Sequence, residues 1–108
     1  MLLHLPKLNA LMLIFPLAAP QAIGGNAAFT GAEVYAQSCA MCHAKGVAGA
    51  PRVGEIDAWR ARAEKGRADL LLSILRGKGG MPPKGGNASL SVHEANAALD
   101  YMLSSSVR

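Results

Sequence analysis

The feature that most constrains this chain is the pentapeptide Cys-Ala-Met-Cys-His at residues 39–43. It contains both cysteines of the 108-residue chain, three residues apart, with a histidine directly after the second. On one helical turn, two cysteines at this spacing can each form a thioether to a vinyl group of the same porphyrin, and the histidine then points its imidazole at the iron. The pattern predicts one covalent haem c, attached through Cys39 and Cys42, with His43 as an axial iron ligand.

Three other uses of these residues remain open from the sequence alone. A redox dithiol uses the same cysteine spacing, but it normally lies on a βαβ scaffold, for which the chain has no pattern. A zinc site needs four ligands, and outside the first 28 residues the sequence adds only the distant His93. A disulfide between Cys39 and Cys42 would close a very small, strained loop.

A haem iron needs a sixth ligand or an open position, and the sequence favours Met81 as that ligand. Met81 lies in a Gly/Pro-rich loop at residues 77–86, where no helical face recruits a methionine for packing. Met102 lies on an apolar helical stripe and is better explained by the core, Met41 lies inside the attachment turn, and His93 is expected to be solvated. The alternative is that residues 77–86 form a flexible linker with an incidental methionine.

The first 24 residues resemble a secretory signal peptide. One early cation, Lys7, precedes an apolar run at residues 8–19, and small residues follow. Cleavage after residue 24 or residue 27 satisfies the small-x-small rule, and an uncleaved leader that acts as a membrane anchor remains an alternative. Export predicts a bacterial periplasmic setting and a folded domain over residues 29–108.

The exported part is small and poor in large side chains. Its four aromatic residues are Phe29, Tyr35, Trp59 and Tyr101. A domain of this size usually needs a further source of stability, which a bound cofactor would supply. The formal net charge is +4, without a basic stripe that carries interleaved aromatics, so nothing suggests nucleic-acid binding. The length excludes dinucleotide-binding sheets and barrels.

The periodicity predicts an all-α domain of about four helices wrapped around the haem. The first helix is expected from residue 29 or 30 to about Met41, and the second from Asp57, as its cap, to Lys65, with Gly66 ending it. The third is expected over residues 68–76. The fourth begins at a Ser91-x-x-Glu94 capping box and continues to about residue 104. Its apolar stripe comprises Val92, Ala95, Leu99, Met102 and Leu103.

Taken together, these residues resemble a known family, the class I cytochromes c, and within it the small bacterial monohaem cytochromes c5. The motifs that carry the resemblance span residues 31–102, nearly the whole exported part. They are the attachment motif, Gly46–Pro51, Trp59-x-x-Arg62 with Gly66, Met81-Pro82-Pro83-x-Gly85-Gly86, and Tyr101-Met102.

The resemblance implies roles for several further residues. Pro51 would offer its carbonyl to the non-ligating nitrogen of His43. Trp59 would bind the haem near its edge and propionates, although a core tryptophan is a competing interpretation. Gly31 and Tyr35 would lie where the first helix crosses the last, near Tyr101. Many cytochromes c5 have a second cysteine pair after the Gly-Gly step, whereas residues 87–90 here read Asn-Ala-Ser-Leu.

The function expected from these residues is that of a periplasmic one-electron carrier, which is not an enzyme. Iron held by His43 and Met81 would have no open position for a substrate. Its partners would be redox proteins that donate and accept electrons, and it would contact a membrane only if the leader is retained. Two alternatives are a membrane-tethered haem subunit of an oxidase or dehydrogenase complex, and a haem sensor or peroxidase with a labile methionine ligand.

Overall fold

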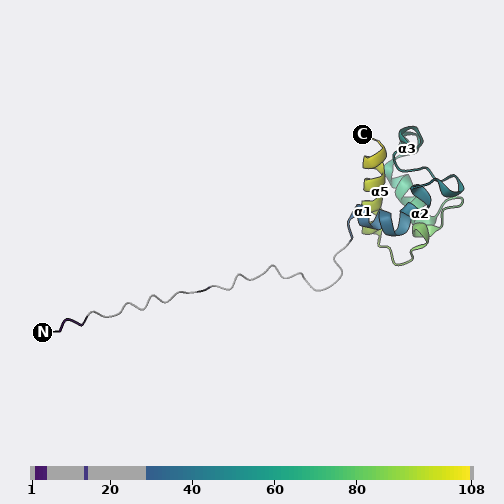
Figure 1. Cartoon of the computed structure of the whole chain (residues 1–108). Coiled ribbons are helices and arrows are strands. Elements are labelled where there is room, and N and C mark those ends of the chain that lie inside the picture. Colours follow the sequence, from purple (N-terminus) through teal and green to yellow (C-terminus); the bar gives the residue numbers. More distant parts are fainter. Residues whose placement is uncertain (1, 5–13, 15–28, 108) are drawn as a thin grey trace.

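The computed structural model describes residues 2–4, 14 and 29–107, which include one folded unit (Figure 1). The expected signal peptide lies almost entirely outside the described residues. Within residues 29–107 the secondary structure is helical, with one isolated bridge between Lys78 and Met81 and no strand. The all-α prediction is therefore confirmed.

The first helical run begins at Thr30 and continues without a break to His43. It consists of α1 (Gly31–Val34), a π-helical turn η1 (Tyr35–Cys39) and α2 (Ala40–His43). Thr30 caps it by accepting a hydrogen bond from the Glu33 backbone N–H, and the Glu33 carboxylate accepts one from the Thr30 N–H. The helix ends two residues later than predicted, at His43, and so places the whole attachment motif on helical backbone.

Two shorter helices follow, α3 (Ile56–Ala63) and α4 (Arg67–Arg76). The expectation that Asp57 caps α3 is wrong, because the cap position is Glu55 and Asp57 lies inside the first turn. A carboxylate is favourable at either place, since both lie at the positive end of the helix dipole. Gly66 separates the two helices as expected, with φ near +94°.

The last helix, α5, spans Val92–Ser106, and its predicted capping box is present. The Ser91 hydroxyl accepts a hydrogen bond from the Glu94 N–H, and the Glu94 carboxylate accepts one from the Ser91 N–H. Ala95, Leu99 and Met102 are buried, but Val92 is 55% exposed, so its place in the apolar stripe is wrong. Leu90, two residues earlier, fills that end of the core instead.

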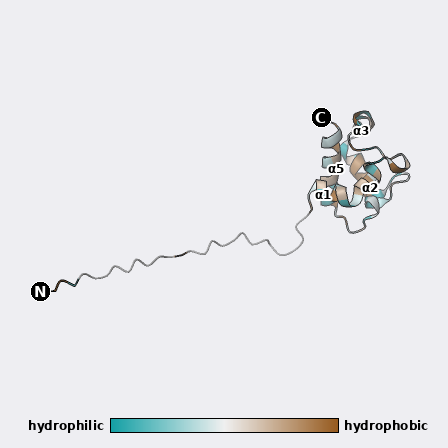
Figure 2. Ribbon diagram, viewed as in Figure 1, coloured by the Kyte–Doolittle hydropathy of each residue, from teal (hydrophilic) through white to brown (hydrophobic). Residues whose placement is uncertain are grey.

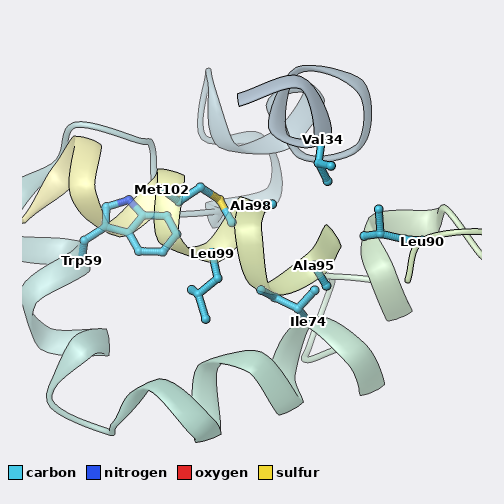
Figure 3. Packing of buried hydrophobic residues seen from close by; sticks show 8 residues of the cluster. All are labelled: Val34, Trp59, Ile74, Leu90, Ala95, Ala98, Leu99 and Met102. Carbon is cyan, nitrogen blue, oxygen red and sulfur yellow. The ribbon is translucent and has the colours of Figure 1, made fainter. Parts of the chain in front are cut away.

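The core forms where α5 meets α1, α3 and α4 (Figure 3). Figure 2 shows polar and apolar positions alternating along these helices, as expected of elements with one buried face. Val34 and Leu90 lie toward one end of the cluster and Trp59 and Met102 toward the other (Figure 3). The buried apolar residues are Val34, Trp59, Ile74, Leu90, Ala95, Ala98, Leu99 and Met102.

The crossing of α1 and α5 requires a residue without a side chain at Gly31. A Cβ at Gly31 would lie 2.2 Å from the Ala97 carbonyl oxygen, so only glycine permits this approach. One turn further, the rings of Tyr35 and Tyr101 pack with their centroids 5.1 Å apart. The helix crossing implied by the resemblance is therefore confirmed.

We expect Gly31→Ala to lower the free energy of unfolding of the haem-loaded protein by about 1–3 kcal/mol, because the new methyl group would push the two helices apart. Denaturant unfolding measures this change. Gly80→Ala is the matched control, since a Cβ there makes only an ordinary contact with the Ala48 methyl at 4.0 Å. A Gly31→Ala protein as stable as the control would contradict the tight crossing.

Candidate haem site

The two cysteines of the attachment motif lie on one helical run and are free thiols. Cys39 ends the π turn, with φ −122° and ψ −35°, and Cys42 lies in α2. Both are partly buried, and Cys39 packs against the core. Burial raises the pKa of the Cys39 thiol, because the charged thiolate is poorly solvated there. Two neighbouring thiols on one helical turn fit the requirement for two thioether bonds to one porphyrin.

His43, the last residue of α2, is only 8% exposed. Its Nδ1 lies 2.8 Å from the Pro51 carbonyl oxygen. Because a carbonyl can only accept, Nδ1 must carry the hydrogen, and Nε2 then keeps its lone pair for a metal. A hydrogen bond of this kind fixes the ring orientation and increases the basicity of a metal-binding imidazole. The structure thus contains the contact that the resemblance implies for Pro51.

The loop that carries Pro51 is fastened to the helices by three further hydrogen bonds. The Val53 N–H donates to the His43 carbonyl at 2.8 Å, and the Trp59 indole N–H donates to the Arg52 carbonyl at 2.8 Å. The Gly54 N–H donates to the buried Ser106 hydroxyl at 2.9 Å. Because Pro51 is followed directly by these anchors, its carbonyl is held in place for His43. Sequence reasoning missed Ser106, because nothing distinguishes it within a run of three serines.

Trp59 lies between the core and His43. It is 4% exposed, and the centroids of the indole and imidazole rings are 5.7 Å apart. Its indole N–H, the one donor of the side chain, already donates to the Arg52 carbonyl. The structure therefore places Trp59 as a core residue beside the histidine. Arg62, one turn later on α3, donates to the Ala58 carbonyl.

Met81 lies in a tight turn that requires glycine at position 77. Lys78 and Met81 exchange two backbone hydrogen bonds, at 3.0 and 2.9 Å. A Cβ at Gly77 would come within 2.8 Å of the Met81 carbonyl oxygen, and Gly77 has φ near +82°. The Met81 side chain is partly buried and packs against the core cluster that Cys39 also contacts. The attachment turn and the Met81 loop thus border the same core.

The other candidate ligands lie elsewhere. Met102 is fully inside the core, as the sequence predicts, and His93 is exposed at the start of α5. Met41 is 87% exposed. Among the described residues, no three His, Cys, Asp or Glu side chains gather into a metal-binding cluster, so a zinc site lacks its ligands there.

Positive side chains gather beside the Met81 loop. Lys65, Arg76 and Lys78 line a surface hollow along α4, together with Asp69. The side chain of Lys65 lowers the pKa of Lys78, first through side-chain hydrogen bonding and then through the repulsion between two like charges. The hollow carries more positive than negative charge.

Comparisons with known proteins agree with this geometry. The model of the family described as "Cytochrome C oxidase, cbb3-type, subunit III" matches residues 26–102. Cytochrome c-555 of Chlorobaculum tepidum is 40% identical over 92 residues, which cover 78% of this chain and 85% of the relative. Cytochrome c5 of Azotobacter vinelandii is 44% identical over 80 residues, covering 72% and 96%.

Solved structures resemble this chain in both fold and sequence. One of them is described as the electron transfer complex of nitrite reductase with cytochrome c, and the matched chain has a TM-score of 0.67 and 41% identity. The match covers 69% of this chain and 91% of that chain. The expected wrapping of about four helices is confirmed by this likeness, with the continuous run over residues 31–43 counted as one helix.

We expect Trp59→Phe to lower the free energy of unfolding by about 1–2 kcal/mol, because the Arg52 carbonyl loses its donor. The haem spectrum should stay unchanged, since Val53 still holds the loop next to His43. Denaturant unfolding and optical spectra of the loaded protein test this, with Tyr101→Phe at the helix crossing as the control. A changed spectrum in Trp59→Phe would instead assign Trp59 a direct contact with the haem.

Proposed function

Because this chain belongs to the class I monohaem cytochrome c family, whose members carry one covalent haem c with iron, we propose that it is a periplasmic one-electron carrier between respiratory redox proteins. The relatives are small cytochromes c that act in electron transfer. The observation that best supports the proposal is the buried His43 imidazole, whose Nδ1 is held by Pro51 at the end of a helix that carries both thiols.

We propose that four side chains hold the haem. Cys39 and Cys42 form the thioethers, and His43 and Met81 supply the two axial iron ligands. When bound, haem c supplies a one-electron couple between ferric and ferrous iron. The soft thioether of Met81 favours the ferrous state and raises the reduction potential relative to harder ligands. With both axial positions taken by the chain, there is no open position for a substrate, which is why we propose a carrier rather than an enzyme.

The partners proposed here are redox proteins that dock briefly. The matched solved structure is of a cytochrome c with nitrite reductase, which is an electron-transfer complex. A carrier must release as well as bind, so a small interface is expected. Lys78 and Lys84, on either side of Met81, would steer an acidic partner toward the Met81 loop.

We further propose that residues 1–24 direct export and that residues 29–108 form the haem domain. A membrane-tethered subunit of an oxidase complex is a second candidate, favoured by the name of the matching family and by the apolar run at residues 8–19. None of the helices in the described part is long and apolar enough to cross a membrane. Mass spectrometry of the mature N-terminus distinguishes a released carrier, which begins near residue 25 or 28, from a tethered one, which retains its leader.

Met81→Ala should open the sixth position of the iron while the haem stays covalently attached. The ferric optical spectrum should lose the weak red band of methionine on ferric iron, and added imidazole should bind more tightly. Met41→Ala is the matched control, because that methionine is exposed on the attachment turn. If Met81→Ala keeps an unchanged six-coordinate spectrum, Met81 is not the ligand.

Replacing Cys39 and Cys42 together by alanine should leave an apo chain that is poorly packed, because the small core then lacks the haem. Near-ultraviolet circular dichroism and amide hydrogen exchange measure the packing. A double variant that unfolds cooperatively and protects its amides from exchange as the haem-loaded protein does would show that the core packs without haem.

A further inference from the structure

One side-chain hydrogen bond joins the Met81 loop to the attachment turn. The Asn87 Nδ2 donates to the Ser38 hydroxyl oxygen at 3.0 Å, across 49 residues of sequence. Ser38 directly precedes Cys39, and Asn87 follows the short 3₁₀ turn η3 (Pro83–Gly86) that comes after Met81. The bond therefore connects the segment that carries a haem thioether with the segment that carries the proposed methionine ligand.

The backbones of the two segments also touch beside this bond. A Cβ at Gly85 would lie 2.5 Å from the Ser38 carbonyl oxygen, and Gly85 has φ near +63°. Only a glycine lets the loop come this close. The Met81 loop thus contacts the backbone of the turn directly before Cys39.

The orientation of the Asn87 side chain is fixed by its own loop. Its Oδ1 accepts a hydrogen bond from the Ser89 N–H at 3.1 Å, so the amide nitrogen must face Ser38. Its backbone N–H donates to Lys84, and its carbonyl accepts from Leu90, a core residue. Both ends of the Asn87 side-chain amide and both of its backbone polar groups are therefore hydrogen-bonded.

The chain between Met81 and Asn87 is only five residues long and is held by its own hydrogen bonds. Pro82 and Pro83 have fixed φ angles. The Gly85 N–H donates to the Pro82 carbonyl and the Asn87 N–H donates to the Lys84 carbonyl, both at 3.1 Å. The position of Asn87 therefore bears on the position of Met81.

We propose that Ser38 and Asn87 form a latch that holds the Met81 loop against the attachment turn and so sets how readily the Met81 sulfur leaves the iron. This inference rests on the proposed function, in which Met81 is the axial ligand. Both are positioning residues, which act through Met81.

The test compares Ser38→Ala, Asn87→Ala and the double variant as ferric, haem-loaded proteins, with imidazole as the competing ligand. Imidazole forms a bond to iron as the Met81 sulfur leaves, and the oxidation state does not change. Each single variant should bind imidazole about fivefold more tightly, which corresponds to the ~1 kcal/mol of one hydrogen bond. The double variant should gain no more than Asn87→Ala alone, because Ser38→Ala removes only a bond that Asn87→Ala already removes.

Two control variants separate the latch from general loss of stability. Asn96→Ala removes another inter-helix amide contact, between Asn96 Oδ1 and Arg67 at 2.8 Å, away from the Met81 loop. It should change the stability without changing imidazole affinity. Ser38→Thr keeps the hydroxyl and should retain wild-type affinity.

Amide hydrogen exchange gives a second readout: Ser89 should lose protection in Asn87→Ala, which removes the acceptor of its N–H, and lose less in Ser38→Ala, which leaves that acceptor in place. Unchanged imidazole affinity in Ser38→Ala and Asn87→Ala would overturn the latch, as would an equal gain in Asn96→Ala. A wild-type ferric protein without the methionine band would overturn the ligand assignment itself, and the latch with it. The wild-type spectrum thus tells a failure of the proposed function from a failure of the latch alone.

Discussion

The hydrogen bond between the His43 imidazole and the Pro51 carbonyl is the interaction on which the rest of the site depends. It fixes which nitrogen of the ring carries the hydrogen, and so which one is free for iron. A long loop supplies the carbonyl, and Val53, Trp59 and Ser106 are needed to keep that loop in place. Trp59 and Ser106, at the end of α5, thus help to hold His43 in place through the loop, although neither is itself proposed as an iron ligand.

The Met81 side of the site is built differently. The Pro51 loop is fixed by bonds to the histidine and to the surrounding helices, whereas the Met81 loop is fixed by close backbone packing at Gly77 and Gly85 and by the contact between Ser38 and Asn87. Both loops border one core that α5 closes. We infer that a small chain with few aromatic residues can position the proposed ligands His43 and Met81 because the cofactor would replace the missing side chains of the core.

Much of this was predictable because the signals are local. The predicted capping box at Ser91 depends on a side chain three residues away, and the Cys-x-x-Cys-His motif depends on five consecutive residues. The cap of α3 was misassigned to Asp57 because an acidic residue is favourable at either position near a helix start. The exposed Val92 was missed because helical periodicity does not indicate where the core ends. The π turn and the pairing of Ser38 with Asn87 depend on tertiary packing, for which the sequence carries no local signal.

The measurement that tests the central claim most directly is the optical spectrum, oxidised and reduced, of protein produced in a host that matures c-type haem. The account predicts a covalent, low-spin haem in both states, with the weak red charge-transfer band of methionine bound to ferric iron. A high-spin or five-coordinate spectrum would contradict ligation by both His43 and Met81, and a protein without covalent haem would contradict the whole account.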